Sequence, residues 1–499
     1  MPGATETDTF QLKNSVEIYG GFEGLSGTED NFGVRDVGSF LSILSGDIEG
    51  NDTTSAKGIV TDTANITGQN SDHVVTGDGT DGTAVLDGFT ITGGQAGPEA
   101  SFASGGGMSN ESGSPTLTNL TFSGNSAEGG GGMNNCVESA PTLTNVTFIA
   151  NTATFNGGGL RNDCSDPSLK NVVFSGNSAG TDGGGMINDF SDPKLTNVIF
   201  SGNSATSGGA MLNRNNSSPT LTNTTFSRNT ATDQNTPGGG MRNLDSAPII
   251  QNSIFWGNSD SFGDGVGAQI FNSPGNPTIA NSLVRGSGGS GGGWSPNLGN
   301  DDGGNVDAEP MFLDADGIDN MAGTLDDDLS LQPGSPAVDM GDNAADLDGG
   351  GPGLETISDI PTDLAGNPRI FNGTVDMGAF ESQVLPLTAT PTEEGGPTVT
   401  LTVTPTTTQT PTQTVSGLDT PTSTPTGTQI QGLSPTPSNT PTDGPSPTVT
   451  NTIGGNVASC DLDIDDDVDA DDLIMLLESD PTNPDAFLFF ARCWFEQVQ

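Results

Sequence analysis

The sequence predicts an all-β fold, a parallel β-solenoid with coils of about 26 residues. The observations behind this prediction are two recurring sequence motifs. The first reads Pro-Thr-Leu-Thr-Asn-Leu-Thr-Phe-Ser-Gly-Asn from Pro115 to Asn125. Its copies begin at Pro141, Pro167, Pro193 and Pro219, and in looser form at Pro248 and Pro277. The second, Gly-Gly-Gly or Gly-Gly-Ala before an apolar residue, ends at Met108, Met133, Leu160, Met186, Met211 and Met241. A fixed period of this length is typical of stacked repeats.

The Asn in the middle of each copy of the first motif predicts a corner of the coil. Leu117 and Phe122 are five residues apart, so strict alternation would place them on opposite faces of a strand. Both positions are nevertheless apolar in each regular copy. A one-residue bend resolves the conflict, because Asn tolerates the left-handed conformation that such a corner requires. The predicted corners are Asn119, Asn145, Asn171, Asn197, Asn223 and Asn252.

One coil is therefore expected to contain a strand, the Asn corner, a strand ending in Phe, a Gly-Asn turn, a Gly-rich strand with Met, and a loop. Stacking places equivalent residues ~4.8 Å apart, which predicts a Phe column, a Leu column and a hydrogen-bonded Asn ladder. A leucine-rich repeat is the alternative, since residues 117–125 match its strand consensus. The four glycines at 129–132 disfavour the helical return of that repeat, so the solenoid of strands is preferred.

The pattern Phe-x-x-Asn followed by Gly-Gly-Ala/Gly-aliphatic resembles the repeat of the polymorphic outer-membrane proteins. The matching pairs are Phe122/Asn125, Phe148/Asn151, Phe174/Asn177, Phe200/Asn203, Phe226/Asn229 and Phe255/Asn258. This resemblance covers about residues 80–285 and implies a right-handed parallel β-helix. We divide that part of the chain into irregular N-terminal coils, residues 1–100, and regular β-helix repeats, residues 101–285.

The period ends after residue 285, and residues 286–382 are rich in Asp and Gly. The segments 331–342, 362–369 and 375–381 are similar to a bacterial choice-of-anchor surface domain. That resemblance implies a cell-surface location and no known chemistry. Physically, these residues are expected to form the last coils and to cap the open end of the stack.

Residues 383–458 form a Thr/Pro-rich stretch in which Thr-Pro-Thr recurs with almost no large apolar residues. This composition cannot bury a core and favours extended polyproline II structure. It predicts a disordered linker before the last segment.

The last segment, residues 459–499, contains an expected calcium loop. Its acidic residues are Asp461, Asp463, Asp465, Asp467, Asp469 and Asp472. Five of them supply oxygens at positions 1, 3, 5, 9 and 12, and Asp467 supplies its backbone carbonyl at position 7, the donor set that Ca²⁺ prefers. An apolar helix is expected to follow from Leu473. The segment resembles a dockerin, which implies calcium-dependent docking and a cohesin-like partner. The acidic loops near residues 314–328 are a second candidate calcium site, and a solvated acidic loop is the equal alternative.

The charge of the chain excludes some partners. Its 12 basic residues against 63 acidic ones give a net charge of −51, which repels nucleic acid and anionic lipid. No apolar run is long enough to span a membrane, and a monomer is expected. The first residues lack the pattern of a signal peptide, so we expect the chain to begin inside a longer extracellular or cell-surface protein.

The four cysteines form no Cys-x-x-Cys pattern and give no support for a zinc site. Cys136 and Cys164 lie about one repeat apart, and Cys460 and Cys493 flank the last segment. Either pair could form a disulfide, and for Cys136 and Cys164 buried free thiols are the alternative.

The sequence thus indicates a secreted or surface-displayed, non-catalytic protein, adhesin-like or a scaffold, that binds an extracellular polysaccharide or a surface protein. The alternative is a polysaccharide lyase or glycoside hydrolase, which requires acidic and basic groups on adjacent coils. The candidates are Asp163, Asp166, Asp189, Asp192, Arg161, Arg214 and Arg242. Asp166 and Asp192 precede Pro and are interpreted as turn residues. No catalytic residue is assigned, and His73 is expected to be a packed or exposed side chain.

Overall fold

A computed structural model describes residues 5–23, 35–97, 103–233, 237–347 and 356–384, all within one compact unit. The calcium loop, its Asp461–Asp472 ligands, Cys460, Cys493 and the linker beyond residue 384 lie outside the described residues. Predictions about them stay predictions.

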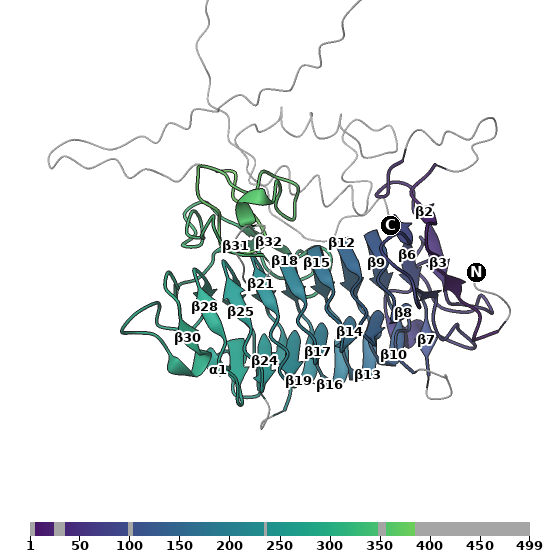
Figure 1. The fold of residues 1–499 in the computed structure, drawn as a ribbon, viewed down its shortest axis with the longest axis horizontal. Coiled ribbons are helices and arrows are strands. Elements are labelled where there is room, and N and C mark those ends of the chain that lie inside the picture. Colours follow the sequence, from purple (N-terminus) through teal and green to yellow (C-terminus); the bar gives the residue numbers. More distant parts are fainter. Residues whose placement is uncertain (1–4, 24–34, 98–102, 234–236, 348–355, 385–499) are drawn as a thin grey trace, which may run out of the picture. The chain divides into compact units, whose positions relative to one another are not determined.

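The described chain winds into three sheets whose neighbouring strands pair in parallel (Figure 1). Sheet 1 contains β1 (Phe10–Gln11), β4 (Val75–Thr76), β8 (Met108–Glu111), β11 (Met133–Cys136), β14 (Leu160–Asp163), β17 (Met186–Asp189), β20 (Met211–Arg214), β24 (Met241–Leu244) and β27 (Ile270–Asn272). Sheet 2 contains β7 (Gln95–Ala96), β10 (Ser126–Gly129), β13 (Thr152–Asn156), β16 (Ser178–Asp182), β19 (Ser204–Ser207) and β23 (Thr230–Ala231).

Sheet 3 is the longest of the three. Its main path contains β2 (Glu17–Tyr19), β5 (Val85–Asp87), β9 (Thr116–Ser123), β12 (Thr142–Ile149), β15 (Ser168–Ser175), β18 (Lys194–Ser201), β21 (Thr220–Thr222), β25 (Ile249–Gln251), β28 (Thr278–Ala280) and β30 (Asn300–Asp301). Beside it lie β3 (Ile43–Ser45), β6 (Thr90–Thr92), β22 (Thr225–Ser227), β26 (Ile254–Trp256) and β29 (Leu283–Val284). The irregular N-terminal coils expected over residues 1–100 contain β1 to β7.

Little else is regular in the described chain. An antiparallel pair, β31 (Phe312–Asp314) and β32 (Asp328–Leu331), follows the coils. The helical elements are α1 (Val266–Gln269) and the 3₁₀ turns η1 (Thr63–Asn65), η2 (Pro296–Leu298) and η3 (Ile357–Asp359). The predicted all-β parallel solenoid is confirmed, and the leucine-rich alternative is wrong because sheet 2 stands where that fold would place its helical return.

The Asn corner is confirmed in every regular coil. Asn119, Asn145 and Asn171 have φ values of 51°, 55° and 55°. Their amides also form the predicted ladder along the solenoid axis: Asn145 Nδ2 donates to Asn119 Oδ1 over 3.0 Å, and Asn171 Nδ2 to Asn145 Oδ1 over 3.1 Å. The left-handed corner turns both Leu117 and Phe122 into the core, where each is fully buried.

The predicted Phe column runs through six coils. The rings of Phe122, Phe148, Phe174, Phe200, Phe226 and Phe255 stack with centroids 4.3–4.9 Å apart and planes within 12° of parallel. The Leu column lies beside it in the same buried core. The strand spacing of a parallel sheet imposes this ring separation, so the stack follows from the coil register.

The Gly-rich stretch, expected to be a strand, is a turn. Gly130 has a φ of 59°, and a Cβ on Gly131 would lie 2.4 Å from the carbonyl oxygen of Thr152 in the next coil. Only glycine fits such a close backbone approach. The expected strand with Met begins directly after the glycines, as β11 does at Met133, and the short run before them, Ser126–Gly129 in β10, forms the additional sheet 2. The predicted Gly124–Asn125 turn is confirmed between β9 and β10.

Two further Asn ladders were not predicted, and both lie inside the solenoid. The first contains Asn125, Asn151, Asn177, Asn203, Asn229 and Asn258, and the second Asn110, Asn135, Asn162, Asn188, Asn213, Asn243 and Asn272. Consecutive side chains are joined at 2.8–3.0 Å. In the first ladder each amide also donates to a strand carbonyl, as Asn177 Nδ2 does to Phe148 O over 2.9 Å. Buried amides that pair in this way avoid the cost of unsatisfied polar groups.

Of residues 286–382, expected to form the last coils and the cap, residues 286–306 lie at the end of the stack and the residues after them do not. The last coil is completed by β30, and Leu298 and Trp294 pack at that end of the core. The following segment instead lies along the flank of sheet 3, beside β18 and β21 (Figure 1). Asn197 Nδ2 donates to Thr362 O over 3.1 Å, and Asn252 Nδ2 to Asp342 O over 3.0 Å. The outward-facing amides of the corner ladder provide the hydrogen-bonding groups for this docking, and Asn197 and Asn252 are buried by it.

Replacing Asn177 by Ala should lower the free energy of unfolding by about 2–4 kcal/mol, because the carbonyl of Phe148 and the amide of Asn151 each lose a partner inside the core. Urea unfolding of the full chain, followed by circular dichroism, measures the change. The matched variant is Asn171→Gly at the half-exposed corner. It keeps a permissive residue at φ 55° and should cost only about 1 kcal/mol. Equal losses in the two variants would contradict a core ladder that stabilises more than the corner ladder.

Candidate functional site

Arginines and aspartates of adjacent coils meet where sheets 1 and 2 join. We call this group the arginine corner: Arg161, Asp163, Asp182, Asp189, Arg214 and Arg242. Left-handed glycines turn the chain here, so outward side chains of sheet 1 lie against the ends of sheet 2 strands. Arg214 on β20 spans the join, with Nη1 3.2 Å from Asp182 on β16 and Nη2 2.7 Å from Asp189 on β17.

The other two arginines of the corner are also held by neighbouring groups. Arg161 lies 2.6 Å from Asp163 and donates to Asn134 Oδ1 over 3.0 Å. Arg242 donates to the hydroxyl of Ser207 over 2.5 Å. Three of the chain's eight arginines thus gather on neighbouring coils of a protein with a net charge of −51. The corner therefore contains as many arginines as carboxylates.

Burial perturbs the ionisation of this corner. Desolvation raises the pKa of Asp182, and the charges of Arg214 and Arg242 oppose that rise. Desolvation likewise lowers the pKa of Arg242, which Asp182 partly offsets. A carboxyl with a raised pKa suits general acid chemistry. Asp182 was not among the sequence candidates, because it stands at a coil position that is variable in sequence.

The structure separates the other enzyme candidates from this corner. Asp166 Oδ1 accepts the backbone N–H of Asp192 over 2.6 Å, and Asp192 Oδ1 accepts that of Ser218 over 2.5 Å. Both carboxylates thus accept backbone N–H groups in the loops that lead to sheet 3. His73 is packed against the coil, with Nδ1 2.9 Å from the carbonyl oxygen of Gly105.

The acidic loops between residues 314 and 328 bind separate partners. Asp316 pairs with Arg228 at 2.9 Å, Asp326 accepts the N–H of Asp319 over 3.1 Å, and Asp327 accepts the hydroxyl of Ser201 over 2.5 Å. Within the described ranges, no three acidic, His or Cys side chains form a group that could hold a metal ion. The calcium predicted for these loops therefore stays a prediction.

Cys136 and Cys164 are both free thiols, which agrees with the alternative to a disulfide. Desolvation raises the pKa of each. A raised pKa reduces the thiolate population that would react with an oxidant or a metal.

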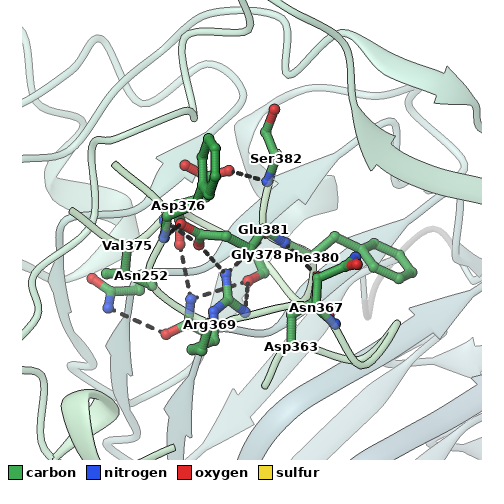
Figure 2. Close-up of polar contacts among 12 residues, drawn as sticks. Asn252, Asp363, Asn367, Arg369, Val375, Asp376, Gly378, Phe380, Glu381 and Ser382 are labelled. Atoms are coloured by element: carbon green, nitrogen blue, oxygen red, sulfur yellow. Dashed lines mark hydrogen bonds and ion pairs between the residues drawn. The ribbon is translucent and has the colours of Figure 1, made fainter. Parts of the chain in front are cut away.

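The motif of residues 362–382 forms a second charged cluster, which we call the Arg369 clasp (Figure 2). Arg369 and Glu381 are fully buried and lie 2.9 Å apart. The guanidinium also donates to the carbonyl oxygens of Gly378, Ala379 and Phe380. Glu381 accepts the N–H groups of Phe371 and Asp376 over 2.7 and 2.9 Å. The residues of this motif thus fold the segment onto itself.

The clasp also joins the segment to the solenoid. Arg369 Nη1 donates to Asn197 Oδ1 over 3.1 Å, the acceptor at the end of the corner ladder. Asn223, the next corner, donates to the carbonyl oxygens of Asp376 and Gly378. Sequence reasoning found the motif but not this role, because Arg369 and Asn197 are 172 residues apart.

Desolvation raises the pKa of Asp376 to about 6 and that of Glu381 to about 7, and for Glu381 the charge of Asp376 contributes further. Hydrogen bonds from backbone N–H groups and the charge of Arg369 act in the opposite direction. The clasp thus places two carboxyl groups close to neutral pKa in a buried site.

Residues 104–284 match the protein-family model described as the right handed beta helix region. These residues are the regular coils, so this part of the chain is a right-handed parallel β-helix. None of the curated proteins matches the chain. Among the described helices, none is both long and apolar enough to cross a membrane.

The clasp should make stability depend on pH. Both pKa values lie above those of the unfolded chain, so the folded chain binds protons more tightly. The resulting stabilisation is fully present below about pH 4 and is lost as the pH rises through 6 to 7. We expect the thermal midpoint of the full chain to be higher near pH 5 than near pH 8.

Glu381→Gln should reduce that difference by roughly 2–4 °C, whereas exposed Asp302→Asn should leave it unchanged. This comparison removes the contribution of general charge repulsion, which both variants share. A pH dependence that is the same in Glu381→Gln and in the wild type would refute the role of the clasp.

Proposed function

We propose that this protein is a secreted or cell-surface scaffold, adhesin-like and non-catalytic, that binds an extracellular polysaccharide or a surface protein. The observation that carries the proposal is the pairing of the charged groups in the arginine corner. Asp163, Asp182 and Asp189 each lie within 3.2 Å of an arginine. The two contacts of Arg214 join its coil to the preceding one, and that of Arg161 lies within a single strand.

Physical chemistry favours a structural role for these pairs. A catalytic acid or base must reach the proton that it transfers, at hydrogen-bond distance or through one water. A substrate at this corner would first have to displace Arg214 from two carboxylates. Breaking such partly buried pairs leaves uncompensated charges and costs free energy.

The stacked side chains make the solenoid stiff, and this stiffness further supports a scaffold role. Ring stacks and amide ladders join each coil to both neighbours, so bending the axis must lengthen several contacts at once. The strong negative charge keeps such a surface soluble and repels other acidic macromolecules.

A carbohydrate-active enzyme is the second candidate, and Asp182 favours it. Its pKa is raised by burial, and it lies between Arg214 and Arg242. A protonated carboxyl beside two guanidinium groups could protonate a leaving group while the arginines hold an acidic sugar.

The two candidates are distinguished by incubating the full chain with pectin, polygalacturonate and alginate, with and without calcium. The scaffold function predicts no new reducing ends and no unsaturated products. If products do form, Asp182→Asn should abolish them, with Asp166→Asn as the control at a turn position. Product formation by the wild type would overturn the non-catalytic function.

We further propose that the segment 459–499 docks to a partner through the calcium loop Asp461–Asp472, with a cohesin-like protein as the candidate. The support is the oxygen spacing in the sequence, which supplies the six or seven ligands of a hard cation. Such a segment would attach the scaffold to another surface component.

Calorimetric titration of the full chain with Ca²⁺ tests the loop. Asp461→Ala combined with Asp472→Ala should abolish the uptake, since it removes two of the carboxylate ligands. Asp319→Ala with Asp326→Ala is the matched control in the acidic loop near residues 314–328, and it should retain the uptake. Loss in the control alone would move the site to that loop, and no uptake by the wild type would refute calcium binding.

A further inference from the structure

A cleft of about 480 Å³ lies between the last coils and the segment around β31. Its polar lining comes from the coils through Arg228, Trp256, Asp264 and Arg285, and from the flanking segment through Glu309, Asp314 and Asp316. The volume falls in the range typical of small-ligand pockets. It is separate from the arginine corner and from the Arg369 clasp.

Ion pairs fix the walls of the cleft. Arg285 lies 2.5 Å from Asp264 and stacks over Trp256 at 5.2 Å from the ring centroid. Arg228 on the coil lies 2.9 Å from Asp316 on the flanking segment. Both guanidinium groups are therefore neutralised by carboxylates before any ligand arrives.

The remaining carboxylates of the lining have no such partner. In the described part of the chain, no hydrogen bond or ion pair engages the side chain of Glu309 or Asp314. Two arginines against four carboxylates leave the lining with a net charge of −2. Since no metal-holding group of side chains exists among the described residues, the lining favours an organic cation over a metal ion.

Apolar side chains lie beside these carboxylates. Leu313 is 55% exposed and Met311 is 38% exposed. Met311 has a left-handed backbone with a φ of 53°, and such strain is retained where the surrounding structure requires it. The lining thus offers apolar surface next to unpaired negative charge, which suits a ligand with an aliphatic stem and a positive end.

We propose that this cleft binds a lysine or arginine side chain of a partner protein. The stem of that side chain packs against Met311, Leu313 and Trp256, and its charge lies between Glu309 and Asp314. Electrostatics favour this ligand over a neutral sugar. A positively charged group is attracted by both carboxylates, whereas a neutral hydroxyl can only donate a hydrogen bond to one of them.

This inference rests on the proposed scaffold function and specifies the chemistry of its surface-protein partner. The probe is a short fluorescent peptide of alternating lysine and leucine, titrated into the full chain at physiological salt and followed by anisotropy. Glu309→Gln with Asp314→Asn should weaken binding by about tenfold. Acetylation removes the positive charge of the lysines. The acetylated peptide should therefore bind the wild type no more tightly than the charged peptide binds this double variant.

Non-specific attraction to an acidic chain is controlled by Glu138→Gln with Asp302→Asn. This pair makes the same chemical changes at exposed positions outside the cleft, so affinity should stay within about twofold of the wild type. Equal weakening in both double variants, or undiminished binding of the acetylated peptide, would overturn the proposal. So would displacement of the peptide by a neutral oligosaccharide. Cleavage of a polysaccharide would refute the non-catalytic function without altering any of these titrations.

Discussion

The buried Asn ladders are the interaction on which the stacking register depends. A carboxamide carries both donors and an acceptor, so one Asn per coil can bond to the coil on each side without a free group remaining inside the core. Asn177 accepts from Asn151 and donates to Asn203, both at 3.0 Å. A strand that slipped by one residue would place these amides against apolar side chains and leave several polar groups unsatisfied. The Phe column stabilises whichever stacking register forms, whereas the buried amides specify a single register.

The corner ladder has a direction, and its ends carry opposite charges. The corner amides from Asn119 to Asn197 donate toward the N-terminal end, and Asn119 Nδ2 donates to the carboxylate of Asp87 over 2.7 Å. At the other end, Asn197 Oδ1 accepts from Arg369. A carboxylate at the donor end and a guanidinium at the acceptor end both strengthen the terminal bonds, because hydrogen bonds to charged groups are stronger than neutral ones. The clasp therefore terminates the ladder as well as docking the flanking segment.

The sequence predicted the elements that repeat and missed those that join distant segments. The Asn corner and the Phe column were predictable because the 26-residue period places the same residue type at the same point of each coil. Sheet 2 was missed because its strands, such as Ser126–Gly129, are short and made of small residues that read as loop. Asp182 and Arg369 act through partners that adopt no fixed spacing in sequence, so only the folded chain identifies them. The chemistry of the calcium loop rests on spacing alone, since it lies outside the described residues.

Arginine is scarce in this chain, and its placement explains how the irregular segments are attached to the solenoid. Arg35 pairs with Asp87, Arg228 with Asp316, and Arg369 with Glu381 while bonding to Asn197. Arg35 joins an insertion to a coil, and Arg228 joins a coil to the flanking segment. Arg369 holds the flanking segment together and joins it to the coils. Because the guanidinium groups are used internally, the negative charge of the outer surface stays uncompensated. A basic partner is therefore attracted from a distance by the whole chain, and a carboxylate without an arginine, such as Glu309, is where its charge can be held.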